Sequence, residues 1–305
     1  MSAAHVPVLP DEVQRFLMPQ PEQIIADLTV GSGGHGIQIW KAMQGRGTLI
    51  ALDRDPEMIE VAKRRFAERG VAEGFVKWVV GSFGDLTEHL AKLGIAGCDG
   101  ILMDLGMNSL QMSESVRGFS FDDEGPLDMR YSRREPVRTL AELLEGMTER
   151  ELEKILHDSD ERFARRIARR VIERRDRGMI RTTRELASAI RSALPRARTW
   201  TRIDPATRSF QAFRILVNDE LGHLGRGLEQ TIAALKPRGR MVVISFHSGE
   251  DRLVKQTFRK YDVRGREGAP ALEILTRKPV RPSDSECERN PRARSARLRA
   301  ALRVV

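Results

Sequence analysis

Cysteine is scarce in this chain. Only Cys98 and Cys287 carry thiols among 305 residues, which is too few for a disulfide framework or for a zinc site built from cysteines. The six histidines follow no metal-ligand spacing, so the sequence predicts no metal. Scarce cysteine also favours a reducing, cytoplasmic setting.

Long apolar runs are absent as well. A run such as MVVISF at 241–246 is far shorter than the roughly 18 residues that a membrane-spanning helix needs. The first residues, MSAAHVPVLPDEV, lack a basic segment followed by an apolar one, which argues against a secretory signal. We therefore expect no membrane partner, and the sequence leaves the oligomeric state open.

Positive charge is in excess. The net charge of +9 favours an anionic partner such as nucleic acid. Much of this charge is arginine in two clusters, at 161–175 and 289–299. The first cluster predicts an amphipathic helix whose Phe163, Ile167 and Val171 form one stripe. Its arginines either contact phosphates or form a solvated face, and the second cluster favours phosphate contact.

Short β-branched strands alternate with helical segments in the first third of the chain. This alternation predicts a parallel-rich sheet with helices on both faces, the Rossmann-like α/β class. The expected strands are 23–30, 48–55, 75–80, 100–106, 239–246 and a last one near 272–276. The expected helices around them are 35–43, 56–69 and 249–261.

The alternation lapses between Asp104 and Met241, where helical patterns take over. A stretch this long indicates an insert that folds by itself, and 209–235 predicts one long helix leading back to the sheet. The helical patterns of the insert lie at 139–158, 161–175 and 182–194. We therefore expect a catalytic domain and an inserted helical substrate-recognition domain, at 1–108 with 208–305 and at 109–207 respectively.

The loop DLTVGSGGHG, which begins at Asp27, raises the question of the ligand. Gly31, Gly33 and Gly36 satisfy the G-x-G-x-x-G spacing between a strand and a helix, as in dinucleotide-binding proteins. Asp53 closes the second strand, where its carboxylate either accepts hydrogen bonds from ribose hydroxyls or only caps a helix. Asp27 suits a ligand that carries an ammonium and a sulfonium better than it suits a pyrophosphate. The loop therefore favours S-adenosylmethionine over a dinucleotide.

Several specific motifs extend over nearly the whole chain. They are HVPVL (5–9), DLTVGSGGHG (27–36), DLGMNSLQ (104–111), RGFSF with GPLDMR (117–130), FQAFRILVNDEL (210–221), ISFHSGEDRLVK (244–255) and NPRARSARLR (290–299). With these motifs in this order, the chain resembles the ribosomal RNA small subunit methyltransferase H family, also called MraW-type. The resemblance implies a class I methyltransferase fold with a helical insert and S-adenosylmethionine as cofactor. It also implies methylation of the exocyclic N4 of a cytidine in small-subunit (16S) ribosomal RNA, at the decoding region.

The resemblance also implies roles for particular residues. The cofactor contacts that it implies are Gly33, Gly34, His35, Asp53, Phe83, Asp104 and Gln111. The family usually has serine, serine and proline at positions 108–110, where this chain has Asn108, Ser109 and Leu110. The chain also departs from the family pattern at Gly249 and near Asp160 and Glu161. These departures leave the cofactor residues intact and bear on the shape of the base pocket, where Asn108 is a candidate for substrate binding.

Four further residues are candidates by their placement. Ser245 and His247 follow the fifth expected strand and should reach the rim that holds Asp104. His247 either takes up the released proton, hydrogen-bonds the base or is structural. Arg214 and Asn218 lie one turn apart on one helix face, where they either face the pocket and bind substrate or cap a loop.

The expected chemistry needs an acceptor for an N4 hydrogen, because the lone pair of a cytosine amine is conjugated with the ring. Asp104 follows the fourth strand, the position of the D-P-P-Y motif in amino methyltransferases. We hypothesise that its carboxylate or the neighbouring backbone carbonyl accepts this hydrogen while the methyl group lies in line. The alternative is that Asp104 only contacts the cofactor. Methylation at carbon 5 would need a cysteine nucleophile, and neither Cys98 nor Cys287 is well placed for that.

Three other functions compete with RNA amino-methylation. An NAD-linked oxidoreductase would need a base at the nicotinamide, which the sequence does not offer. A non-catalytic RNA-binding ribosome-assembly factor would be free to lose Gly33, Gly34, Asp53 and Asp104, which are intact. An amino-methyltransferase acting on another nucleic acid, such as DNA, is disfavoured by the family resemblance alone.

Overall fold

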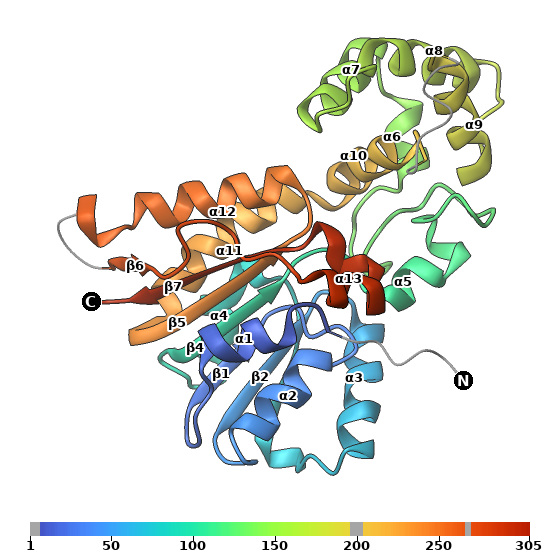
Figure 1. Ribbon diagram of the computed structural model, residues 1–305. Helices are drawn as coiled ribbons and strands as arrows, with labels where there is room; N and C mark the ends of the chain where they lie inside the picture. Colours follow the sequence, from blue (N-terminus) through green and yellow to red (C-terminus); the bar gives the residue numbers. More distant parts are fainter. Residues whose placement is uncertain (1–6, 196–203, 266–269) are drawn as a thin grey trace. The chain divides into compact units, whose positions relative to one another are not determined.

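The computed structural model of the chain describes residues 7–195, 204–265 and 270–305 and is drawn in Figure 1. Contacts divide the chain into two compact units. Unit 1 comprises Met1–Gly106 with Leu221–Val305, and unit 2 comprises Met107–Glu220. The expected insert at 109–207 lies within unit 2. Residues 208–220 join it, because α10 (Thr207–Asn218) buries its apolar face in the core of unit 2.

Unit 1 is built on a seven-stranded sheet in the order β3-β2-β1-β4-β5-β7-β6. Neighbours from β3 to β5 run parallel, and β7 runs antiparallel to both β5 and β6. The strands are β1 (Ile24–Asp27), β2 (Thr48–Asp53), β3 (Val76–Val80), β4 (Cys98–Asp104), β5 (Leu235–Ser245), β6 (Leu272–Ile274) and β7 (Arg297–Arg303). The predicted class, a parallel-rich α/β sheet, is confirmed.

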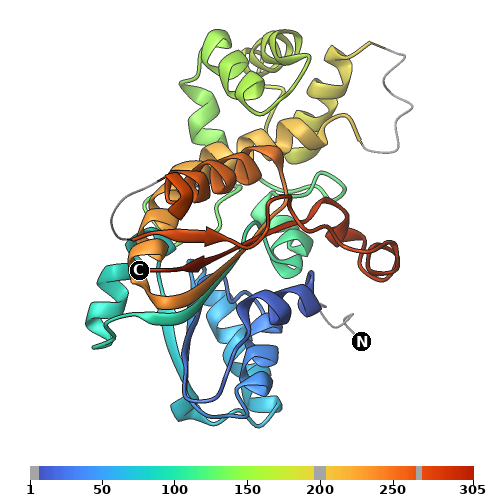
Figure 2. The ribbon, with the colours of Figure 1, turned by 60° about the vertical axis from the view of Figure 1, so that its left-hand side comes forward.

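Helices cover both faces of this sheet (Figure 2). Successive residues of a strand point to opposite faces; in β2, for example, Leu49 joins one apolar cluster and Ile50 the other. The helices on the first face are α1 (Pro10–Leu17), α2 (Gly34–Ala42) and α3 (Pro56–Glu68). Those on the second are α4 (Leu86–Lys92), α11 (Glu220–Ala234) and α12 (Ser248–Lys260). The short α13 (Asp284–Arg289) precedes β7.

Two sequence expectations for unit 1 and its junction were wrong. The long helix expected at 209–235 is interrupted at Asp219, whose φ of 46° and ψ of 43° are left-handed, so that α10 ends and α11 begins there. The strand near 272–276 is not the last, because β7 follows it. The basic composition of 289–299 concealed β7, in which Leu298 and Ala300 are fully buried.

Unit 2 consists of helices around an apolar core of its own. Four of them begin with a capping box. In three of these, Thr139, Thr148 and Thr182 exchange hydrogen bonds with a glutamate three residues later. Besides α10, the helices are α5 (Ser109–Ser113), α6 (Leu140–Glu145), α7 (Glu149–Asp158), α8 (Ala164–Asp176) and α9 (Thr183–Ala193). Short 3-10 helices of the described chain are Ser115–Arg117 in unit 2 and, in unit 1, Glu73–Phe75, Phe83–Asp85, Val263–Gly265 and Pro291–Ser295. Among the described residues, no helix combines the length and the apolar character that crossing a membrane requires.

Candidate active site

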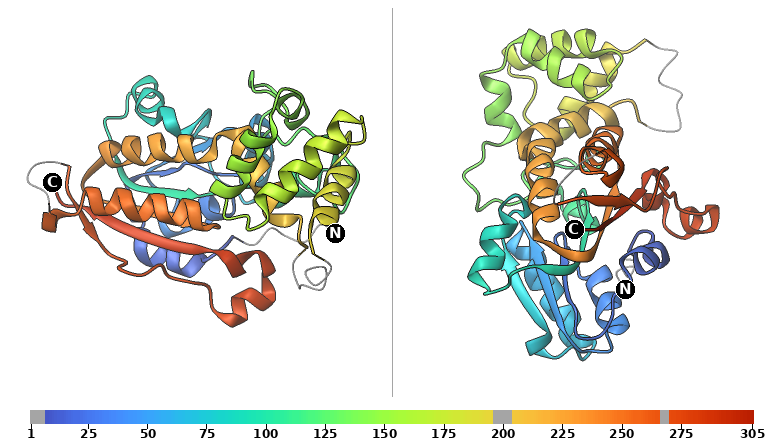
Figure 3. Two further views of the ribbon diagram at one scale, coloured as in Figure 1. Left: turned by 90° about the horizontal axis from the view of Figure 1, so that it is seen from above. Right: turned by 90° about the vertical axis from the view of Figure 1, so that its left-hand side faces the viewer.

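Three carboxylates end strands at one edge of the sheet in unit 1. Asp27 ends β1, Asp53 ends β2 and Asp104 ends β4. Because β1 pairs in parallel with both β2 and β4, all three carboxylates lie at the carboxyl edge, where open α/β sheets bind their ligands. Figure 3 gives two further views of this sheet.

The glycine loop between β1 and α2 packs closely against α3. Gly33 has a φ of +84°, and a Cβ there would lie 2.6 Å from Cε2 of Phe66. A Cβ at Gly36 would lie 2.8 Å from Cζ of the same ring. The Arg65 guanidinium donates to the carbonyl and hydroxyl oxygens of Ser32 at 2.9 and 2.7 Å. These glycines are therefore needed for packing on Phe66, whatever ligand the loop holds.

Asp53 holds this loop in place. Its Oδ2 accepts a hydrogen bond from the Gly31 N–H at 2.8 Å, and its Oδ1 accepts one from the Asp55 N–H at 2.9 Å. The cap of α3 is Asp55, which accepts from the Glu57 N–H at 3.0 Å, so Asp53 is not a helix cap. Burial raises the pKa of the Asp53 carboxyl to about 6, against the two N–H donors. The ribose contact stays a prediction.

His35 and Asp104 form a buried polar pair beside the loop. Gly34 and His35 begin α2, and His35 Nε2 lies 3.6 Å from Asp104 Oδ2 with the His35 side chain 6% exposed. Both ring nitrogens of His35 and Oδ1 of Asp104 are buried without a hydrogen-bond partner among the described residues. Buried polar atoms in proteins normally have partners. These atoms therefore fit a ligand that offers donors and acceptors, as the amino-acid part of S-adenosylmethionine does.

Asp27 adds a second buried carboxyl to this edge. Its side chain is 1% exposed, and its Oδ1 accepts a hydrogen bond from the Thr29 N–H at 3.2 Å. Burial raises the pKa of Asp27 to about 7, against the opposing effect of His35. Thr29, which sequence reasoning missed, also accepts from the Asp104 N–H through Oγ1 at 2.7 Å. Near neutral pH, Asp27 is therefore poised to ionise when a cation arrives.

Phe83, one of the cofactor contacts that the resemblance implies, is half-buried against α11. A Cβ at Gly227 would lie 2.8 Å from Cε2 of the Phe83 ring and still closer to Cδ2, so only glycine admits the ring there. The preceding Ser82 Oγ lies 3.1 Å from His223 Nδ1 and accepts from the Gly84 N–H at 3.0 Å. Gly227 and His223 were missed by sequence reasoning, because nothing in their local pattern connects them with Phe83.

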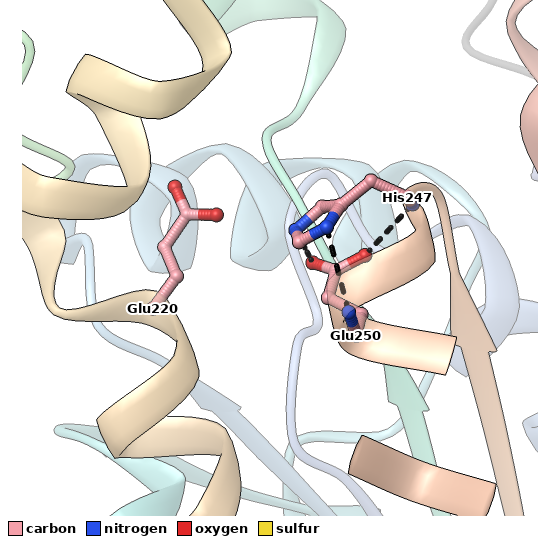
Figure 4. Close-up of side chains that lie close together, drawn as sticks. All are labelled: Glu220, His247 and Glu250. Atoms are coloured by element: carbon pink, nitrogen blue, oxygen red, sulfur yellow. Dashed lines mark hydrogen bonds and ion pairs between the residues drawn. The ribbon is translucent and has the colours of Figure 1, made fainter. Parts of the chain in front are cut away.

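Ser245 and His247 lie at the end of β5 and make structural contacts. The Ser245 hydroxyl is buried and donates to the Arg297 carbonyl of β7 at 3.3 Å. His247 caps α12: its Nδ1 accepts from the Glu250 N–H at 3.4 Å, and its Nε2 lies 3.3 Å from Glu250 Oε1 (Figure 4). His247 Nε2 is nevertheless buried without a hydrogen-bond partner among the described residues, and the roles of both residues at the active site stay predictions.

Asn108 and Gln111 belong to unit 2, where they form the capping box of α5. The Asn108 side chain accepts from the Leu110 N–H at 3.1 Å, and Gln111 Oε1 accepts from the Asn108 N–H at 3.0 Å. Gln111 is 5% exposed. The pair shapes the chain directly after unit 1, and its contacts to cofactor or substrate stay predictions.

Arg214 and Asn218 also lie in unit 2, where they hold a loop. The Arg214 guanidinium donates to both carboxylate oxygens of Glu220, at 2.7 and 3.0 Å. The Asn218 side chain donates to the Met129 carbonyl at 2.8 Å and accepts from the Tyr131 N–H at 2.8 Å. Asn218 is 2% exposed. Of the two alternatives that the sequence left open for Asn218, these contacts match loop capping.

Cys98 begins β4, whereas Asp104 ends it. The thiol is fully buried, and burial raises its pKa to about 12. A nucleophilic cysteine needs a lowered pKa and access to substrate. Cys98 is therefore unsuited to attack carbon 6 of a cytosine.

The chain is similar to known proteins over its full length. A relative from Geobacter sulfurreducens, named ribosomal RNA small subunit methyltransferase H, is 46% identical over 317 aligned positions that cover 100% of both chains. A protein of the same name from Syntrophotalea carbinolica is 45% identical and 98% of each chain is covered. More distantly, the solved structure of an rRNA methylase from Streptococcus thermophilus has a TM-score of 0.44 and 9% identity, covering 97% of this chain and 94% of that one. The model of the MraW methylase family matches residues 2–304, and the chain therefore belongs to the MraW methylase family.

Proposed function

We propose that the protein transfers the methyl group of S-adenosylmethionine to the exocyclic N4 of a cytidine in small-subunit (16S) ribosomal RNA, in the decoding region and in the cytoplasm. The observation that carries this proposal is full-length identity of 46% to a ribosomal RNA small subunit methyltransferase H. The three strand-end carboxylates and the polar atoms of His35 and Asp104 that lack partners support a cationic, amino-acid-bearing cofactor.

In the proposed mechanism the bound cofactor supplies an electrophilic methyl group on sulfur. The chain holds the cofactor against the loop at Gly33 and Gly34, with Asp53 toward the ribose and Phe83 toward the adenine. Asp104 accepts a hydrogen bond from N4 through Oδ1, which has no partner among the described residues. This contact orients the amine and draws its lone pair out of conjugation with the ring. The new N–C bond would form as the C–S bond breaks, which would leave the cofactor sulfur as a neutral thioether, and N4 would release its proton to solvent water.

This proposal assigns no proton transfer to His247, whose Nδ1 already accepts from the Glu250 N–H and whose Nε2 lies 3.3 Å from Glu250 Oε1 without a hydrogen bond among the described residues. Methylation at carbon 5 is also outside it, because the Cys98 thiol is buried at the amino end of β4. To enter the active site, the target cytidine must first unstack from its neighbours in the RNA, which costs a few kcal/mol.

The test uses labelled S-adenosylmethionine with unmethylated small subunits, naked ribosomal RNA and DNA, followed by nucleoside mass spectrometry. We expect N4-methylcytidine in ribosomal RNA. Label in DNA alone would favour an amino-methyltransferase with another substrate, and RNA binding without label would favour a non-catalytic assembly factor. Failure to bind the cofactor would refute the enzymatic proposal.

The role of Asp104 is tested by Asp104→Asn. We expect normal folding and a large loss of methyl transfer at saturating cofactor. His247→Gln, which keeps an acceptor for the Glu250 N–H, is the matched variant and should retain transfer. An Asp104→Asn protein that binds cofactor and methylates at the wild-type rate would leave Asp104 without a catalytic role.

A further inference from the structure

Four arginines around the start of α8 have no side-chain partner among the described residues. Arg162 lies in the turn before the helix, and Arg165, Arg166 and Arg169 lie in its first two turns. All four are exposed. We call these four residues the arginine stripe.

The arginine stripe is a single face. Within α8, Arg165 and Arg166 are adjacent and Arg169 follows them by four and three residues, so these three side chains fall within about 100° of the helix circumference. Arg162 lies three residues before Arg165, in the turn before the helix. The buried positions of α8 are Ala164, Ile167, Ala168 and Val171. At about 100° per residue these positions lie opposite the stripe, which therefore faces away from the core of unit 2.

The arginines further along α8 differ from the stripe because they have partners within unit 2. Arg170 and Arg177 both pair with Glu173, at 3.1 and 2.9 Å. Arg175 donates to the carbonyls of Leu144 and Met147. Contacts within the fold thus account for these arginines, whereas they leave the stripe without a structural role.

Local energetics work against the stripe. Like charges three or four residues apart on a helix repel one another. Cations near the start of a helix also oppose its dipole, which favours acidic residues there, and the first turn of α8 contains no acidic residue. An arrangement that weakens its own helix is explained if an anion binds it.

We propose that the arginine stripe binds the phosphate backbone of the substrate RNA. This inference rests on the proposed function, and charge complementarity carries it. Guanidinium groups bind phosphate oxygens in a bidentate manner. Backbone contacts set affinity and orientation and carry no sequence information, so the stripe contributes to holding the RNA and leaves base selection to the catalytic edge.

The test compares two double variants of the same helix. Arg165→Gln with Arg169→Gln removes two charges from the stripe, and Arg170→Gln with Arg177→Gln removes two charges that are paired with Glu173. Glutamine has nearly the helix propensity of arginine. Binding of small-subunit RNA is measured between 50 and 200 mM salt, together with cofactor affinity and thermal unfolding.

Each phosphate contact adds about 0.7–0.9 to the slope of log K against log salt. The slope measured for the stripe variant should therefore be smaller than that of wild type by about 1.5. Over the fourfold rise in salt, wild type should lose roughly eightfold more affinity than the stripe variant. Cofactor affinity should not change, and the melting temperature should stay the same or rise, because repulsion is relieved. The paired variant should keep a slope close to that of wild type.

Equal slopes for wild type and the stripe variant would overturn the inference, as would equal losses in both variants. A loss on assembled subunits with none on naked RNA would also overturn it, because the stripe would then meet a protein. The binding assay needs no turnover. Failure of the proposed function, seen as no methylation by wild type, is therefore distinct from failure of the stripe.

Discussion

Replacing Asp27 by asparagine should stabilise the protein at neutral pH and have little effect in acid. Burial raises the pKa of this carboxyl from 3.8 to about 7 in the folded protein, whereas the unfolded chain keeps a value near 3.9. Below about pH 4 the group is protonated in both states and contributes no pH-dependent difference. As the pH rises from about 4 to 7, only the unfolded state ionises, so the folded state loses stability. Above pH 7 the loss is complete.

The size of this effect follows from the shift of about three pKa units. Each unit corresponds to 1.36 kcal/mol, so the carboxyl destabilises the folded state by about 4 kcal/mol at pH 8. Asparagine carries no charge and keeps an acceptor for the Thr29 N–H. The Asp27→Asn protein should thus match wild type at pH 4 and gain up to about 4 kcal/mol in unfolding free energy by pH 8.

Urea unfolding of both proteins from pH 4 to pH 8 measures this difference directly. Asp123→Asn is the matched control, because it makes the same substitution at an exposed position. Cofactor affinity gives a second readout, because cationic groups near Asp27 favour its ionised form. Wild-type affinity for S-adenosylmethionine should rise between pH 6 and 8, and the rise should be smaller in Asp27→Asn. Unfolding curves that stay parallel over the whole range would refute the reasoning.

Three further predictions concern packing and buried polar contacts. Gly227→Ala should displace Phe83, lower the unfolding free energy by about 1–3 kcal/mol and weaken cofactor binding. Gly225→Ala is the control: its Cβ would meet only a contact at 4.0 Å, so it should stabilise α11 by up to about 1 kcal/mol. Calorimetry of both variants with and without cofactor tests this, and equal effects would contradict the role given to Phe83. Asn218→Ala leaves buried backbone groups without partners and should lower the unfolding free energy by about 2–4 kcal/mol. Denaturant titration measures this loss, and a loss under about 1 kcal/mol would contradict the prediction. Arg299→Met breaks the 2.7 Å ion pair with Asp251 and should lower the unfolding free energy by about 2 kcal/mol. RNA affinity at fixed salt should not change. Weaker RNA binding would instead assign Arg299 to the RNA-binding surface.

The sequence by itself determined the framework of the catalytic edge. Buried β-branched runs, the glycine loop and the caps are local signals, readable within a dozen or so residues. They located β1, β2 and β4, whose ends bring Asp27, Asp53 and Asp104 to one edge of the sheet. The family motifs then indicated the cofactor and the substrate, because these depend on which residues are present in which order.

Only the tertiary structure decided which polar side chains are already occupied. Asn218 bonds to Met129 and Tyr131, both far away in sequence, and no local pattern indicates such a partner. Ser245 donates to a strand that its arginines had concealed. Partners of this kind meet only when distant segments pack together. For the same reason no local pattern in the arginine-rich segment shows that Arg175 donates to the distant carbonyls of Leu144 and Met147.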